Sequence, residues 1–207
     1  HRALQLLCGR LAELGFHCLR FDWYGAGDSA GDTADATAQL WLRNVRAAAA
    51  ELRARSGMQR IGVVGVRLGA LLAAKAVAGG LDAASLLLWD PPADGASWLA
   101  EMRRLDRESL QQWNRQRPRS TRLEAPDQSQ LFGMSVSSDW SESIAGLQAD
   151  LAAPGVQIAC SQDEAAAAGG LRLPDASCWS RAGWITRPWN PRASAELVAE
   201  HLNRTLS

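Results

Sequence analysis

Residues 61–72 (IGVVGVRLGALL) constrain the fold of this chain more than any other stretch. The near-continuous apolar run at its start is typical of a parallel strand that is covered on both faces. A turn flanked by Gly65 and Gly69 follows, and the small and apolar residues from 68 to 77 predict a helix that packs closely on a sheet. A strand, a tight turn and a helix in this order predict an α/β fold.

The neighbouring segments repeat this alternation. Leucines at positions 4, 7, 11 and 14 lie on one face of a predicted helix that Gly15 can end. The other predicted elements before residue 93 are a strand at 16–22 (FHCLRFD), a helix capped by Thr37 or Asp35 and ended by Gly57, a strand at 60–65, and a strand at 84–90. This order predicts a mostly parallel sheet with right-handed crossovers and helices on both faces.

Residues 93–150 depart from the pattern. A helix is predicted around residues 98–105, but residues 113–130 are polar, rich in arginine and weakly periodic. We therefore expect a small inserted cap or lid at 93–150, with residues 1–92 and 151–207 forming the core. Within the second part of the core, we predict strands at 156–160, 177–179 and 184–186, and a final helix opened by Asn190 and Pro191.

Composition excludes several classes of function. The formal net charge of the 207 residues is zero, which disfavours nucleic acid and anionic membrane surfaces as partners. The chain has no run of 18 apolar residues, so no membrane span is expected. Three histidines and four dispersed cysteines offer no metal-ligand spacing, and no cofactor is expected. The cysteines favour a reduced, cytoplasmic protein, with two disulfides as the alternative.

A second glycine pattern, GAGDSA at residues 25–30, fits the dinucleotide-binding fingerprint only in its spacing. Asp28 and Asp32 would face a pyrophosphate, and no helix begins at the second glycine. A tight loop that needs positive φ at its glycines is the favoured interpretation.

The turn at residues 65–69 (GVRLG) carries the most specific chemical signal. It has the spacing of G-x-S-x-G, the strand-to-helix turn that presents a catalytic serine, but Arg67 stands at the serine position. A guanidinium stays protonated and has no lone pair with which to attack a carbonyl. Arg67 either binds an anion beside the helix N-terminus or forms an ion pair with Asp22, Asp90 or Asp163.

Three segments together resemble the α/β-hydrolase superfamily, near its serine aminopeptidase-like branch. They are DWYGAGDS at 22–29, GVRLGALLA at 65–73 and LLLWDPPADG at 86–95. More narrowly, the last two of these segments resemble the hydrolase-like proteins associated with the exosortase A system, and this resemblance extends over residues 1–98. The resemblance implies a three-layer fold whose first three strands precede residue 1, which would leave a sheet edge exposed.

The resemblance also implies a triad of Ser, Asp or Glu, and His in chain order. Asp163 stands where the family acid is expected, after the strand at 156–160. The histidine is expected just before the last helix, where the sequence is Pro188-Trp189-Asn190-Pro191. His1, His17 and His201 all lie elsewhere in the sequence, so two of the three catalytic roles are vacant.

The sequence therefore predicts a non-catalytic binding or accessory protein, and the resemblance points to an exosortase or exopolysaccharide system. The cleft is expected to receive a small-molecule, acyl or peptide ligand, or protein partners. Its predicted lining comprises Trp23, Gly25, Gly27, Ser29, Arg67, Leu68 and Asp163. The alternatives are an active esterase or peptidase that uses Ser29, Ser161 or Cys160 as nucleophile, and a purely structural assembly subunit.

Overall fold

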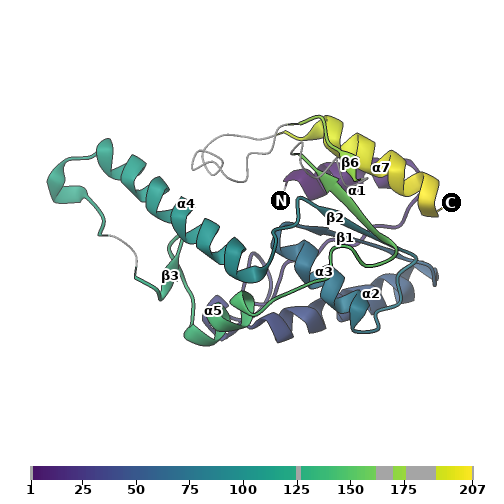
Figure 1. The fold of residues 1–207 in the computed structure, drawn as a ribbon, viewed down its shortest axis with the longest axis horizontal. Helices are drawn as coiled ribbons and strands as arrows, with labels where there is room; N and C mark the ends of the chain where they lie inside the picture. Colours follow the sequence, from purple (N-terminus) through teal and green to yellow (C-terminus); the bar gives the residue numbers. More distant parts are fainter. Residues whose placement is uncertain (1, 125–126, 162–169, 176–189, 207) are drawn as a thin grey trace.

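The computed structural model describes residues 2–124, 127–161, 170–175 and 190–206. These residues form a four-stranded parallel sheet in the order β1-β2-β5-β6, with helices on both faces (Figure 1). The strands are β1 (Gly62–Val66), β2 (Ser85–Trp89), β5 (Val156–Cys160) and β6 (Leu171–Arg172). The predicted mixed α/β class and the parallel pairing of the sheet are confirmed.

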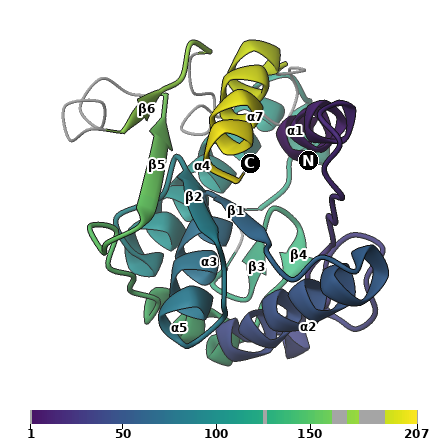
Figure 2. The same ribbon diagram turned by 90° about the vertical axis from the view of Figure 1, so that its right-hand side faces the viewer.

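Two helical layers enclose the sheet. Helices α1 (Arg2–Glu13) and α7 (Arg192–Leu206) lie on one face, and α2 (Ala38–Ser56) and α3 (Leu68–Ala78) lie on the other (Figure 2). Successive side chains of β2 alternate between these layers because strand side chains have a period of two. Leu87 and Trp89 pack with α1 and α7, whereas Leu86 and Leu88 pack with α3. Burial on both faces explains why β2 is apolar from Leu86 to Trp89.

The ends of α2 follow the predicted capping residues. Thr37 is the N-cap, and its side chain accepts a hydrogen bond from the Leu40 N–H. Gly57 ends the helix in the left-handed conformation, with φ 72°. Asp35, the other predicted cap, instead belongs to the 3-10 helix η1 (Thr33–Asp35).

The strand predicted at residues 16–22 is wrong, since this segment has no regular secondary structure. A strand is defined by its backbone pairing to a neighbour, and β1 pairs with β2 alone among the described strands. Residues 19–21 line two separate cavities, one toward β1 and one toward α2. Apolar residues are interspersed through residues 16–22, but no strand among the described residues pairs with this segment on either side.

Residues 93–150 contain more structure than the sequence predicts. They form α4 (Gly95–Arg115), η2 (Arg119–Thr121), β3 (Gln130–Leu131), β4 (Met134–Ser135) and α5 (Ser138–Ala145). The far end of α4 extends away from the sheet (Figure 1). The β3–β4 hairpin was not predicted; its two turn residues, Phe132 and Gly133, both have positive φ.

The core of this segment is continuous with the core beneath the sheet. Leu105 of α4 and Ile144 of α5 are fully buried in the same cluster as Leu71 and Leu72 of α3. The buried Asp106 carboxylate accepts the Phe132 N–H at 3.0 Å, which fixes the hairpin on α4. The structure therefore connects α4 and α5 to the sheet through shared packing, and α4 approaches the carboxyl ends of the strands.

The C-terminal elements agree with the prediction where they are described. β5 has the predicted bounds, and α7 follows Pro191. The predicted strands at 177–179 and 184–186 lie outside the described residues, and the short strand β6 was not predicted. Within the described ranges, no helix is both long and apolar enough to cross a membrane.

Candidate functional site

Three parallel strands end at the same edge of the sheet, and each is followed by a polar residue. Arg67 follows β1, Asp90 follows β2 and Ser161 follows β5. In open α/β sheets, ligands bind outside the carboxyl ends of the strands, so this edge is the candidate site.

The backbone at Arg67 has the strained geometry of a sharp strand-to-helix turn. Its φ of 53° and ψ of −123° are rare for a residue with a side chain. The turn is held because the Arg67 N–H donates to the Trp89 carbonyl at 3.0 Å, and the Arg67 carbonyl accepts from the Ala70 N–H at 2.9 Å. Such strain persists only where the surrounding structure holds it in place.

Gly65 makes this turn possible. A Cβ atom at this position would lie 2.5 Å from Ala70 Cα and 2.7 Å from Ala70 N, closer than packed atoms approach. Gly69, the second glycine of the motif, is different, because a Cβ there would meet only Trp23, at 3.8 Å. The first turn of α3 therefore lies directly against β1, and only the first of the two glycines is required for this contact.

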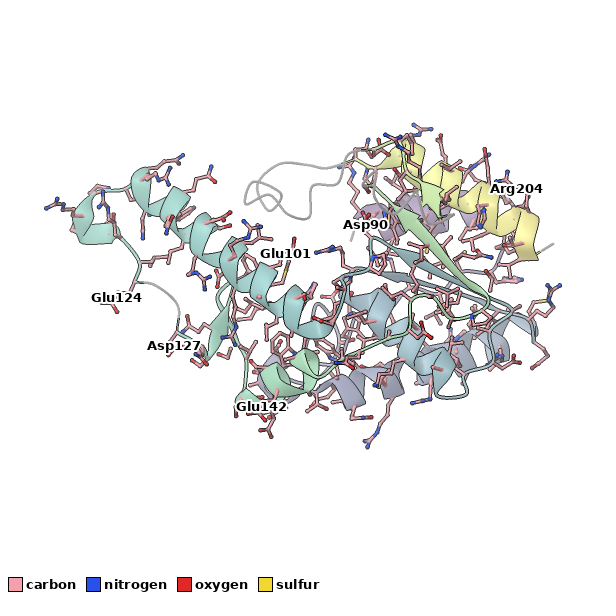
Figure 3. All side chains as sticks on the ribbon, viewed as in Figure 1. Asp90, Glu101, Glu124, Asp127, Glu142 and Arg204 are labelled. Atoms are coloured by element: carbon pink, nitrogen blue, oxygen red, sulfur yellow. The ribbon has the colours of Figure 1, made fainter. Side chains whose placement is uncertain are left out.

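The Arg67 side chain is held by an ion pair across the site. Its guanidinium contacts the Glu101 carboxylate of α4 and also donates to the Asp90 carbonyl at 3.3 Å. The two paired side chains are 18% and 21% exposed. Glu101 lies in the part of α4 nearest the sheet (Figure 3). This pair therefore connects the first helix of the predicted cap to the carboxyl end of β1.

An ion pair was predicted, but its partner was not. Of the three predicted partners, Asp90 contributes its backbone carbonyl, Asp22 accepts the Asp28 N–H at 3.3 Å, and Asp163 lies outside the described residues. Glu101 has one signal in the sequence. It follows Trp98 by three residues and precedes Leu105 by four, so a charged residue occupies a position on the apolar face of α4.

Asp90 and Ser161 form a second polar pair at the same edge. The Asp90 carboxylate is buried and accepts the Ser161 N–H and the Ser161 hydroxyl, both at 2.7 Å. The Asp90 backbone has φ 45°, and its N–H donates to the Ala159 carbonyl at 2.8 Å. Burial, together with the charge of Asp90, raises the pKa of the neighbouring Cys160 thiol to about 11. Cys160 is therefore a protonated thiol at neutral pH and a poor nucleophile.

The loop at residues 25–29 is closed by its own hydrogen bonds. The Ser29 hydroxyl donates to the Asp22 carbonyl at 2.6 Å, and the Gly25 N–H donates to the Ala30 carbonyl at 2.9 Å. Gly25 and Gly27 have φ of 75° and 59°, as the tight-loop interpretation requires. The loop is fixed to α2, because the Tyr24 N–H donates to Asn44 and the Trp41 indole donates to the Tyr24 carbonyl.

The remaining predicted lining residues are apolar. The Trp23 ring stacks at a tilt on Trp41, with centroids 5.6 Å apart, and lies beside Gly69 at the start of α3. Leu68 is buried in the core cluster formed by α2, α3, α4 and α5. The structure thus brings Arg67 and Leu68 together by chain connectivity and adds Trp23 beside α3.

The described histidines lie away from Arg67. His17 is exposed on the segment between α1 and η1. His201 lies on α7, where its Nε2 is 3.0 Å from Gln157 Oε1. Gln157 is the second residue of β5, so His201 is at the amino end of the sheet, opposite Ser161. His1 is outside the described residues. Neither described histidine is placed to act as a base at the carboxyl edge.

Side chains that ligate metals do not gather at one place in the part of the chain that the structure describes. No group of three or more His, Cys, Asp or Glu side chains there could hold a metal ion. The carboxyl edge of the sheet thus presents the Arg67 guanidinium paired with the Glu101 carboxylate. It also presents the Ser161 hydroxyl, which donates to the buried Asp90 carboxylate.

Comparison with known proteins adds no further assignment. The chain matches no family model, and no curated protein matches it.

Proposed function

We propose that this protein is a non-catalytic member of the α/β-hydrolase type, which uses the carboxyl edge of its sheet for binding or assembly. The observation that carries the proposal is the ion pair between Arg67 and Glu101. The residue at the nucleophile position of the turn is a cation that holds a neighbouring helix. A serine hydrolase would need a free hydroxyl and a nearby base at the same place.

Two physical features support the absence of catalysis at Arg67. A guanidinium remains protonated at every physiological pH and offers no electron pair to a carbonyl carbon. The side chain is also occupied, since its nitrogens contact Glu101 and the Asp90 carbonyl. A ligand with a carboxylate or phosphate group would reach Arg67 by replacing Glu101, because such anions match the guanidinium in charge and geometry.

We further propose that the protein performs this binding or assembly role in an exosortase or exopolysaccharide system. The support is the sequence resemblance of the segments at 65–73 and 86–95. In that setting we expect a small acyl or peptide ligand, or a protein partner, at the carboxyl edge of the sheet. Glu101 then acts as an internal anion that pairs with Arg67 until the ligand replaces it.

A second candidate is an active hydrolase that uses Ser161. The observation in its favour is the 2.7 Å hydrogen bond from the Ser161 hydroxyl to the buried Asp90 carboxylate. The other two predicted nucleophiles have less support. Ser29 donates its hydroxyl hydrogen to a backbone carbonyl, which is not a base, and Cys160 has a raised pKa. Neither described histidine, His17 or His201, contacts Ser161. Its remaining partner, the Asp90 carboxylate, is a weak base toward a hydroxyl.

The test is hydrolysis of p-nitrophenyl butyrate and leucine p-nitroanilide by the wild-type chain and by the Arg67→Ala and Ser161→Ala variants. The proposal predicts the same background rate for all three proteins. Turnover that is lost only in Ser161→Ala would support the second candidate. Turnover that is lost only in Arg67→Ala would show that the guanidinium takes part in catalysis and would overturn the proposal.

A further inference from the structure

The far end of α4 presents a surface that belongs neither to the core nor to the carboxyl edge of the sheet. This end extends away from the sheet, and the chain turns back there through η2 (Figure 1). We call residues 113–123 (WNRQRPRSTRL) the tip. Trp113 lies about 18 Å along the helix from Glu101, at a rise of about 1.5 Å per residue. The tip is therefore separate from the Arg67–Glu101 pair, and its role is independent of the proposed function.

Positive charge is concentrated on the tip. Its charged residues are all arginines, and each of them is exposed: Arg115, Arg117, Arg119 and Arg122. Glu108 before the tip pairs with Arg104, and no described acidic side chain forms an ion pair with the four arginines. The net charge of the whole chain is zero. Charges farther away than about 10 Å are nevertheless screened at about 0.1 M salt, so the tip presents a positive field of its own.

The tip also exposes two large apolar side chains. Trp113 is 48% exposed, and Leu123 is 60% exposed, which is the largest fraction among the exposed large hydrophobic residues that the structure describes. Neither side chain belongs to any of the hydrophobic core clusters formed by the described residues. Packing within the folded chain therefore does not account for these two residues.

Specific contacts hold the apolar and basic side chains of the tip together. The Asn114 side chain accepts the Leu123 N–H at 3.0 Å and donates to the Leu123 carbonyl at 2.9 Å, which fixes Leu123 beside the last turn of α4. The Arg117 guanidinium stacks on the Trp113 ring, with its central carbon 4.0 Å from the ring centroid. The Arg122 side chain donates to the Arg117 carbonyl at 3.3 Å. The fold thus gathers like charges and exposed apolar groups at one end of the molecule, although the charges repel one another.

We propose that the tip docks on the surface of an anionic lipid bilayer. Clusters of about four to eight arginines or lysines bind anionic headgroups, and an indole ring favours the interface between headgroups and acyl chains. The four guanidiniums contact the headgroup phosphates, and Trp113 and Leu123 enter the boundary below them. The protein then lies on the bilayer by the far end of α4 and does not span it.

Two other anionic partners suit the tip less well. A single-stranded nucleic acid binds through aromatic rings whose faces are open to its bases, but Arg117 covers one face of Trp113 and Leu123 has no such face. A stable complex with an acidic protein would need about 20–30 residues on each side of the interface, more than the tip provides. A bilayer needs neither an open aromatic face nor a wide complementary surface.

The experiment measures co-sedimentation of the whole chain with phosphatidylcholine vesicles that contain either about 30% phosphatidylglycerol or none. The charge variant combines Arg117→Gln, Arg119→Gln and Arg122→Gln. The matched control removes the same charge from exposed arginines elsewhere and combines Arg43→Gln, Arg55→Gln and Arg192→Gln. We expect the wild type and the control to bind the anionic vesicles at least about tenfold more tightly than the neutral ones, and the charge variant to lose this preference.

The apolar contact is tested separately with Leu123→Gln. Its matched control is Met58→Gln, which changes another exposed apolar residue, 56% exposed. We expect Leu123→Gln to bind the anionic vesicles at least about threefold more weakly and Met58→Gln to bind them as the wild type does. With brominated acyl chains in the vesicles, the wild type should lose a larger fraction of its tryptophan fluorescence than Trp113→Phe. Far-UV circular dichroism checks that every variant keeps the helix content of the wild type.

Several results would overturn the inference. They are no co-sedimentation with anionic vesicles at about 1 mM lipid, equal binding to neutral vesicles, equal losses in the charge variant and its control, and equal binding of Leu123→Gln and Met58→Gln. Equal fluorescence quenching in the wild type and Trp113→Phe would also contradict it. Complete displacement from the vesicles by an oligonucleotide of about 20 nucleotides, or by poly-L-glutamate, at equal charge concentration would instead assign the tip to a nucleic acid or an acidic protein.

Discussion

The guanidinium of Arg67 and the carboxylate of Glu101 form an ion pair that joins the turn after β1 to helix α4. Both side chains are about four-fifths shielded from water, with 18% and 21% exposure. The residue at the serine position of the G-x-S-x-G spacing thus holds α4 against the carboxyl edge of the sheet.

The Arg67–Glu101 pair should show a coupling energy in a double-mutant cycle of Arg67→Gln and Glu101→Gln. We expect a coupling of about 1–3 kcal/mol in urea unfolding, because a shielded pair keeps more of its attraction than one in open water. The control is the exposed pair Arg192–Glu196, whose side chains are 75% and 46% exposed. Its cycle should give about 0.5 kcal/mol or less. Equal coupling in the two cycles would contradict the structural role of the Arg67 pair.

The backbone strain at Arg67 should appear in a comparison of Arg67→Ala with Arg67→Gly. Both variants lose the ion pair, so their difference reports the backbone alone. We expect the glycine variant to be more stable by about 1 kcal/mol, since glycine adopts φ of 53° without a steric cost. As the control, the exposed helical residue Ala50 changed to glycine should lose about 1 kcal/mol. If Arg67→Gly is instead the less stable of the two, the turn is not strained.

The two glycines of the turn should differ in their tolerance of a methyl group. Gly65→Ala is expected to destabilise the chain by about 2–3 kcal/mol, because its Cβ would overlap the backbone of α3. Gly69→Ala is expected to be neutral or to stabilise by up to about 1 kcal/mol, since its Cβ meets only Trp23. Thermal unfolding of both variants provides the measurement. Similar losses for both would mean that α3 does not cross β1 as closely as described.

Much of the fold follows from local patterns in the sequence. The apolar runs predicted β1, β2 and β5, and Thr37 and Gly57 set the ends of α2. The segment at 16–22 shows the limit of such reasoning. The side-chain pattern of this segment is compatible with a strand. A strand also needs backbone hydrogen bonds to a neighbouring strand, and no described strand pairs with residues 16–22.

Only the part of the site that depends on a local sequence pattern could be predicted. The spacing of residues 65–69 placed Arg67 at a strand-to-helix turn, and the structure has this turn. Its partner Glu101 comes from a helix 34 residues away, and no local pattern pairs the two. The Asp90–Ser161 contact spans 71 residues and depends on β2 lying beside β5, which the order of elements alone did not specify.

The thiols of Cys8 and Cys18 should titrate as a coupled pair. The neighbouring Cys18 thiol lowers the pKa of Cys8 to about 7, with a further lowering by Arg20 against the effect of burial, and Cys8 in turn raises the pKa of Cys18. The Cys8 thiolate therefore forms as the pH rises through about 7. Alkylation of Cys8 by iodoacetamide, followed by peptide mass spectrometry, should reach half of its maximal rate near that pH.

Two controls accompany the thiol prediction. In Cys18→Ala, Cys8 loses the neighbouring thiol that lowers its pKa, so its half-maximal pH should move up toward the ordinary value for a thiol. Cys160, whose pKa is raised to about 11, should react slowly until the pH approaches that value. If Cys8 titrates at the same pH with and without Cys18, the coupling between the two thiols is absent.

The central claim is that the carboxyl edge of the sheet presents a paired guanidinium at Arg67 and no activated serine. Labelling of the wild-type chain with a fluorophosphonate, read as intact mass, tests it most directly because the reagent needs no knowledge of the substrate. We predict no adduct at a reagent concentration that fully labels an active serine hydrolase used as the standard. A stoichiometric adduct that maps to Ser161 or Ser29 would contradict the claim.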